Sequence, residues 1–134
     1  MKDKHKLMYM KMAQVMAEES KDKRLQVGCI IVKGNNIIST GYNGHTQHID
    51  DLNQLPDGTT DPRVRHAEKN GLMGLIRSNE SSVGSVMFVT HACCEYCAID
   101  IVDAGIVEVY YRDEYRCTKG LDHLTSYGVK VYKL

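Results

Sequence analysis

The sequence has no excess of charge of either sign. Its 17 Lys and Arg residues balance 17 Asp and Glu residues. A chain without a global basic field has no general attraction for nucleic acid or for an anionic membrane surface. We therefore expect neither a nucleic-acid partner nor a membrane partner, and an anionic substrate has to be held by local cations.

Long apolar runs are also missing. No stretch reaches the roughly 18 consecutive apolar residues that a membrane helix needs, and the opening MKDKHKLMYMKMAQ has no apolar run of signal-peptide length. We expect a soluble protein of the cytoplasm. A compact chain of this type suits a bacterial virus as well as a cell, and in the viral case we expect the host cytoplasm.

Proline is scarce and confined to one region. Both prolines lie in the segment from Gly41 to Pro62, which is rich in Gly, Asn, Asp and Thr and has little periodicity. This pattern predicts a long loop, and loops of this length are usually functional or mobile. The remaining composition, 43% apolar and 25% charged in 134 residues, is typical of one globular domain spanning residues 1–134.

The apolar pattern predicts alternating helices and strands. A helix ending near Ser20 is indicated by apolar side chains at Leu7, Met8, Met12, Val15 and Met16, which we interpret as core packing. The further elements expected are a hairpin from 26 to 43, a helix 66–77, a strand 85–90, a helix 95–105, a strand 107–111, a helix 121–128 and a strand 129–134. This order predicts an α/β fold, a three-layer α/β/α sandwich with a mixed five-stranded sheet and helices on both faces.

The cysteines argue against disulfides. There are five, an odd number, in a chain without an export signal, so metal binding or catalysis is the better explanation for a clustered set. Cys29, in an apolar run, is interpreted as a small buried hydrophobic residue. Three other cysteines gather in the stretch THACCEYC, Thr90 to Cys97.

Cys94 and Cys97 form a C-x-x-C pair at the start of a predicted helix. There, free backbone N–H groups and the helix dipole favour thiolates, which are ligands for Zn²⁺. His66, at the start of the preceding predicted helix, is the best candidate for a third ligand. Such a set leaves an open fourth position, as in catalytic zinc sites, and a structural zinc or separate buried residues are the alternatives.

Glu68 lies two residues beyond His66. It is suited to act as general base and acid on zinc-activated water. The alternative is a carboxylate that merely stabilises the start of its helix.

Several motifs together resemble the zinc-dependent deoxycytidylate (dCMP) deaminases of the cytidine and deoxycytidylate deaminase superfamily. His66 and Glu68 match H-x-E, and Cys94 and Cys97 match C-x-x-C. SKDKRLQVG, GYNG, HAEKN, VTHACCEYC and AGIVEVYYRDEY occur in the family's order across most of the chain. Cys93 stands where the family usually has proline, which raises the question of ligand choice. The x-x spacing to Cys97 selects Cys94.

The resemblance implies roles for further residues. Those implied to bind substrate are Asn43, Ala67, Tyr115, Arg112 and Arg116, and those implied to belong to an effector site are Gly41, Tyr42, Gly44 and Asn70. Asn43 is alternatively a turn residue, and the two arginines are alternatively a solvated charged loop. His45, His48, Asp50 and Asp51 suggest either a second metal site or simply a polar loop.

The implied activity is deamination of dCMP to dUMP and ammonia, which supplies thymidylate synthesis. The resemblance also implies activation by dCTP, inhibition by dTTP, Mg²⁺ accompanying a triphosphate effector, and a homo-oligomer, with a hexamer favoured. Deamination of cytosine, cytidine or a tRNA base is the alternative within the superfamily. A zinc-stabilised binding module without activity is the alternative from another class.

Overall fold

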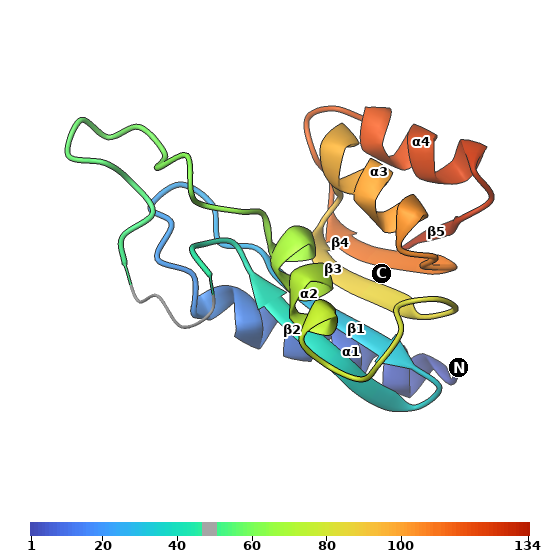
Figure 1. Cartoon of the computed structure of the whole chain (residues 1–134). Coiled ribbons are helices and arrows are strands. Elements are labelled where there is room, and N and C mark those ends of the chain that lie inside the picture. Colours follow the sequence, from blue (N-terminus) through green and yellow to red (C-terminus); the bar gives the residue numbers. More distant parts are fainter. Residues whose placement is uncertain (47–50) are drawn as a thin grey trace.

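A computed structural model describes residues 1–46 and 51–134 of the chain (Figure 1). Five strands form one sheet in the order β2-β1-β3-β4-β5. The strands are β1 (Gly28–Lys33), β2 (Asn36–Tyr42), β3 (Val86–His91), β4 (Glu108–Asp113) and β5 (Lys130–Lys133). The helices are α1 (Asp3–Glu18), α2 (Ala67–Ile76), α3 (Glu95–Asp103) and α4 (Lys119–Ser126). The elements predicted from the sequence are confirmed in type and order.

The sheet is mixed, as predicted. β1 pairs antiparallel with both β2 and β3, whereas β3, β4 and β5 run parallel. The β1–β2 hairpin turns at Gly34, whose φ of 62° is readily adopted only by glycine. Helices α3 and α4 connect the parallel strands, because a parallel pair needs a crossover that spans the length of the sheet.

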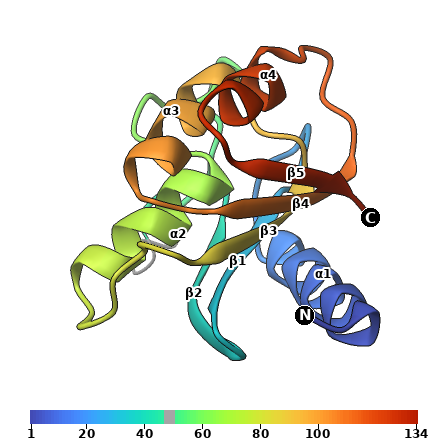
Figure 2. The same cartoon turned by 90° about the vertical axis from the view of Figure 1, so that its right-hand side faces the viewer.

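Helices cover both faces of the sheet. In Figure 2, α1 lies on one side, and α2, α3 and α4 lie on the other. Successive residues of β1 point to opposite faces: Cys29 and Ile31 join the cluster under α2–α4, while Ile30 and Val32 join the cluster under α1. This alternation confirms the three-layer α/β/α arrangement.

The prediction for the buried side of α1 was wrong in part. The helix buries Tyr9, Met10, Ala13 and Ala17 against the sheet. Leu7, Met8, Met12 and Val15, called here the outer stripe of α1, are 38–60% exposed. The small residues face the sheet because the backbones approach closely there: a Cβ on Gly28 would lie 1.9 Å from the carbonyl oxygen of Ala13. Met16 is half-buried and packs against the α1 cluster, as expected.

Three chain segments meet at the carboxyl end of β3. The strand ends at His91, and Ala92 and Cys93 lead directly into α3. Helix α2 begins beside α3 on the same face, because both pack on the one hydrophobic cluster. The starts of two helices and the end of one strand therefore converge. Within the described residues, no helix has the length and apolar character required to cross a membrane.

Candidate active site

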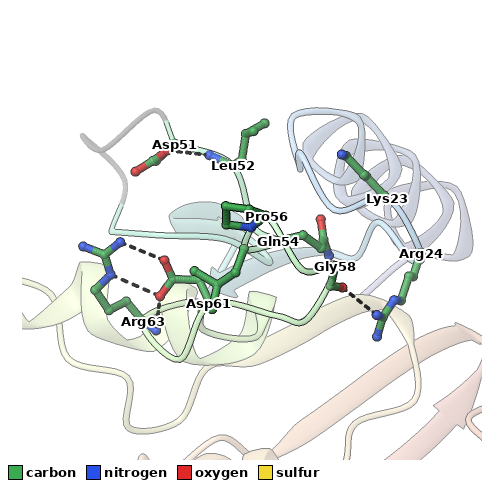
Figure 3. A pocket seen from close by; sticks show the side chains of 10 residues that line it. Lys23, Arg24, Asp51, Leu52, Gln54, Pro56, Gly58, Asp61 and Arg63 are labelled. Atoms are coloured by element: carbon green, nitrogen blue, oxygen red, sulfur yellow. Dashed lines mark hydrogen bonds and ion pairs between the residues drawn. The ribbon is translucent and has the colours of Figure 1, made fainter.

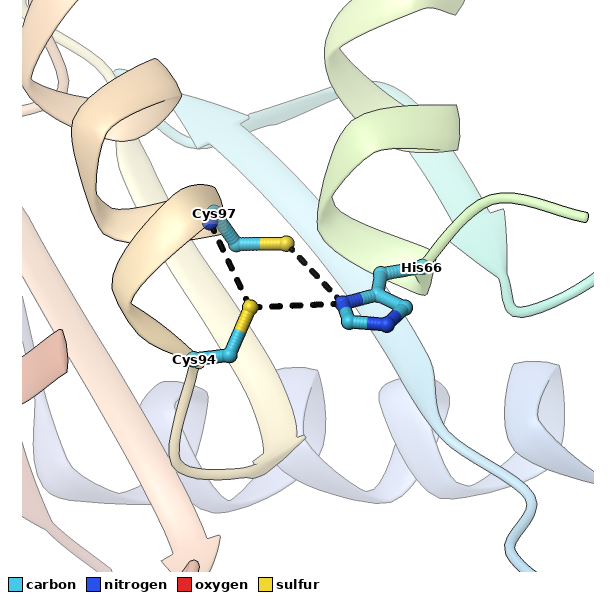
Figure 4. A group of neighbouring side chains, drawn as sticks. All are labelled: His66, Cys94 and Cys97. Atoms are coloured by element: carbon cyan, nitrogen blue, oxygen red, sulfur yellow. Dashed lines mark hydrogen bonds between the residues drawn. The ribbon is translucent and has the colours of Figure 1, made fainter. Parts of the chain in front are cut away.

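His66, Cys94 and Cys97 come together at the facing ends of α2 and α3 (Figure 4). The Nδ1 atom of His66 lies 3.3 Å from the Sγ atom of Cys97 and 3.4 Å from the Sγ atom of Cys94. A tetrahedral Zn²⁺ with usual bond lengths would place imidazole nitrogen and thiolate sulfur about 3.6 Å apart. The three side chains therefore fit a zinc ion with small adjustments, and they supply its preferred donor atoms.

Local structure at the start of α3 fixes the two sulfurs. Cys94 is the N-cap residue, and its Sγ atom accepts a hydrogen bond from the backbone N–H of Cys97 at 3.5 Å. The Cys97 thiol, which also hydrogen-bonds to Cys94, lowers the pKa of Cys94 to about 4. The same contact, together with burial, raises the pKa of Cys97.

Cys93 lies outside this group. Its side chain is 1% exposed and packs in the hydrophobic cluster, and burial raises the pKa of its thiol. Helix α4 contacts this turn so closely that a Cβ on Gly120 would lie 2.2 Å from the carbonyl oxygen of Cys93. Helix α4 thus packs directly against the backbone of the turn that carries Cys94.

Glu68 stands in the first turn of α2, beside His66, Cys94 and Cys97, which are called here the triad. It is 4% exposed, and burial raises the pKa of its carboxyl group. Together with His66 and Cys94 it lines a pocket of about 230 Å³. A buried carboxyl group with a raised pKa, next to a set of potential metal ligands, is suited to accept and return a proton.

The predicted substrate residues divide into two groups. Asn43, Ala67 and Tyr115 line the same pocket as Glu68. Asn43 accepts a hydrogen bond from the backbone of Val27 through Oδ1 and donates from Nδ2 to the carbonyl oxygen of Leu25, so its side chain is held in one orientation.

Arg112 and Arg116 are not part of the pocket wall. The guanidinium of Arg112 pairs with Asp113 at 2.8 Å. The guanidinium of Arg116 lies 5.7 Å from the ring centre of Tyr115, which does line the pocket. The described residues of the wall include no Lys or Arg.

The residues predicted for an effector site surround one buried amide. Asn70 is 3% exposed and donates from Nδ2 to the carbonyl oxygens of Tyr42 and Gly44. Gly41 is buried on β2 against the first turn of α2. These contacts attach the start of the long loop to α2, and the effector role stays a prediction.

Sequence reasoning did not single out several residues of the pocket wall. His91 is one of them: its Nδ1 atom lies 2.9 Å from Oγ1 of Thr90, and its Nε2 atom lies 3.4 Å from Asp113. Burial lowers the pKa of this imidazole. Asp22 and Thr60 reach the wall from distant loops. Only the position of His91 at the end of a strand could have drawn attention to it.

The long loop carries a second hollow, of about 540 Å³ (Figure 3). Arg24 donates to the carbonyl oxygen of Gly58 at 2.8 Å, and Arg63 pairs with Asp61 at 2.7 Å on its wall. Of the residues suggested for a second metal site, His48 and Asp50 lie outside the described residues. His45 contacts the carbonyl oxygen of Leu52 at 2.9 Å, and residues 1–46 and 51–134 contain no potential metal group beyond the triad.

Solved structures with similar folds include one that covers the whole chain. The dCMP deaminase from the cyanophage S-TIM5, in complex with dCMP and dUMP, is 43% identical, with a TM-score of 0.94 and coverage of 100% of this chain and 99% of that one. A tRNA:A34 deaminase structure, 19% identical with a TM-score of 0.67, shares the fold.

Curated relatives give the same family. An uncharacterised deaminase of Aliivibrio fischeri is 33% identical over 92% of this chain and 79% of its own length. The human deoxycytidylate deaminase is 35% identical over 79% of this chain, but the chain spans only 63% of that protein and 37% of the yeast one. Residues 3–113 match the family described as cytidine and deoxycytidylate deaminase zinc-binding region. The chain is a deaminase and belongs to the cytidine and deoxycytidylate deaminase family.

Proposed function

We propose that this chain hydrolyses the exocyclic amine of dCMP, giving dUMP and ammonia. One observation carries the proposal: His66, Cys94 and Cys97 form one group, and two of them, His66 and Cys94, line the same pocket as the buried Glu68. The substrate is inferred from full-length likeness to the cyanophage protein that was crystallised with dCMP and dUMP. In a cell the product would feed thymidylate synthesis.

His66, Cys94 and Cys97 would hold Zn²⁺ in this proposal. The donor set, one imidazole and two thiolates, is that of a zinc site with a position left for water. When bound, Zn²⁺ supplies the Lewis acidity that makes water a competent nucleophile near neutral pH.

Glu68 moves the protons. Its carboxylate takes a proton from the attacking water and delivers it to N3 of the pyrimidine as the new bond to C4 forms. It then takes the remaining proton from the new hydroxyl group on C4 and passes it to the amine, so that the C4–N bond breaks and ammonia leaves as the C4 carbonyl forms. Burial of Glu68 suits both steps because a raised pKa brings the carboxyl group closer to the pKa of the groups with which it exchanges protons.

Asn43 and Tyr115 would contact the sugar side of the nucleotide. The amide of Asn43 uses only one of its two N–H groups on Leu25, which leaves the second for a substrate hydroxyl. The phosphate would lie at the mouth of the pocket near Tyr115, where one candidate cation is Arg116, which lies against the Tyr115 ring, and the other is Arg112, which would have to leave Asp113. Ala67, fully buried at the wall, would pack against the base.

Ammonia release tests the proposal directly. The purified protein is assayed with dCMP, deoxycytidine, cytidine and cytosine, with zinc content measured on the same sample. We expect one zinc per chain and a strong preference for dCMP. Preference for a substrate without phosphate would reassign the substrate within the family, and zinc-loaded protein inactive on all four would support a binding module.

Regulation and assembly are proposed on resemblance. We propose activation by dCTP, inhibition by dTTP, Mg²⁺ carried by the triphosphate, and a homo-oligomer, with a hexamer favoured, working in the cytoplasm. Gly41, Tyr42, Gly44 and Asn70 would form the effector site. A curve of rate against dCMP concentration tests this: we expect a sigmoidal curve that dCTP makes hyperbolic. Hyperbolic kinetics unaffected by either triphosphate would contradict regulation without touching the proposed reaction.

A further inference from the structure

The outer stripe of α1 is an apolar surface without a partner in the described part of the chain. Leu7, Met8, Met12 and Val15 are 54%, 43%, 38% and 60% exposed. They border a shallow hollow of about 440 Å³ along the helix. In Figures 1 and 2, α1 covers the face of the sheet opposite to α2–α4, so its outer side faces away from the active site. Contiguous exposed apolar side chains of this kind commonly mark interaction sites.

Charges of opposite sign flank the stripe. Lys4 precedes it, and Glu18 and Glu19 follow it, and at 100° per residue all of them lie on the same side of the helix as Met8 and Val15. Lys4, Glu18 and Glu19 are exposed and form no ion pair with any described residue. The surface is therefore basic at one end, apolar in the middle and acidic at the other end.

We propose that this surface binds the same surface of a second copy, with the two α1 helices antiparallel across a two-fold axis near Lys11. Leu7 would then contact the partner's Val15, and Lys4 would face the partner's Glu18. Both pairings follow from one axis position, because residues 7 and 15, like 4 and 18, are equally distant from residue 11. The two charged ends lie about 21 Å apart along the helix, so both ion pairs form at once.

Self-association fits this surface better than other occupants. A two-fold contact requires a self-complementary surface, and a basic end paired with an acidic end is self-complementary only when the helices are antiparallel. Lys4 and Lys11 balance Glu18 and Glu19 on this surface, so it has no net positive charge that would hold an anionic membrane or a nucleic acid. Lys11, at the axis, can keep its ammonium group in water while its methylene chain covers the apolar side chains.

The contact area sets the expected strength. Two helices of this length bury less than the roughly 1,200 Å² at the low end of stable interfaces. We therefore expect an equilibrium that is visible in the micromolar range, either as a dimer or as the weaker contact within a larger assembly.

Charge reversal tests the pairing. Lys4→Glu and Glu18→Lys each place like charges at both ends of the homotypic contact, and each should weaken association about tenfold. A mixture of the two variants restores opposite charges in the mixed pair, so it should associate as well as the wild type. Sedimentation velocity across the micromolar range measures both. Lys130→Glu, an exposed charge change on β5, is the matched control and should leave association unchanged.

A second pair of variants tests the apolar contact. Val15→Lys should abolish association at the α1 contact, while zinc content and turnover per chain stay at wild-type values. Association of Val15→Lys equal to that of the wild type, or a mixture of Lys4→Glu and Glu18→Lys no stronger than either variant alone, would overturn the proposal. A wild-type protein that shows no α1-dependent association across the micromolar range would overturn it as well.

Discussion

The two faces of the sheet differ in what they carry. The face under α2, α3 and α4 holds the triad, a candidate metal site, together with Glu68, and its pocket is formed where helix starts meet the end of β3. The face under α1 holds stacked aromatic rings, with Phe88 and Tyr110 4.9 Å apart, and none of the triad or Glu68. Helix starts offer free N–H groups and positive dipole ends, whereas a helix lying across a sheet offers only its side. The candidate catalytic residues and the aromatic cluster therefore lie on opposite faces of the sheet.

Changes on the site face should therefore remove function and spare the fold. The largest effect is expected for Cys97→Ser, which removes a sulfur from the triad. We expect loss of bound zinc and activity below detection, measured by metal analysis and ammonia release. Cys93→Ala is the matched control, since Cys93 lies outside the triad, and it should keep zinc and activity. Loss of zinc in Cys93→Ala would overturn the choice of Cys94 over Cys93 as a ligand.

Glu68→Gln separates proton transfer from metal binding on the same face. Turnover should fall about 10²–10⁴-fold, while zinc content stays at the wild-type value because Glu68 is outside the triad. Glu95→Gln provides the control: it changes the exposed acidic residue in the first turn of α3 and should leave the rate almost unaltered. A Glu68→Gln protein with wild-type turnover would refute the proposed acid–base role.

Substitutions in the cluster under α1 should have the opposite effect: they should lower the stability of the fold and leave turnover unchanged. Met10→Ala deletes a side chain that is 3% exposed and should lower the free energy of unfolding by about 2–5 kcal/mol, with turnover per folded chain unchanged. Met8→Ala, on the opposite side of α1, should change the free energy of unfolding by no more than about 0.5 kcal/mol. Denaturant melts at protein concentrations below self-association measure both. Equal losses from the two variants would contradict the described orientation of α1.

The long loop belongs to neither face, and the smallest effect is expected there. Hydrogen bonds from Arg63 lower the pKa of Asp61 to about 2, from an ordinary value near 3.8. A depressed folded-state pKa stabilises the fold above the ordinary value, and this contribution disappears as the pH falls from about 4 toward 2. The melting temperature of Asp61→Asn should therefore be lower than that of the wild type at pH values above 4, and the two melting temperatures should converge near pH 2. A constant difference across that range would show that Asp61 stabilises the loop without titrating.

The sequence was sufficient for the fold and for the members of the triad. Period-two apolar runs and helix spacing predicted every element, because both patterns report which residues face a core. The outer stripe of α1 was misjudged because a helix with apolar residues on two sides does not reveal which side meets the sheet. That choice depended on Ala13 and Ala17, whose small size lets Gly28 approach.

The sequence by itself determined the candidate donor atoms, since C-x-x-C and H-x-E each place their groups within one helical turn, where geometry is local. Only the tertiary structure decided what surrounds them. His91 and Thr60 come from segments far apart in the chain, and Arg112 turned out to be paired with Asp113. A pocket wall is assembled by the packing of β3 against α2 and α3, and the charge at its mouth depends on which ion pairs that packing permits.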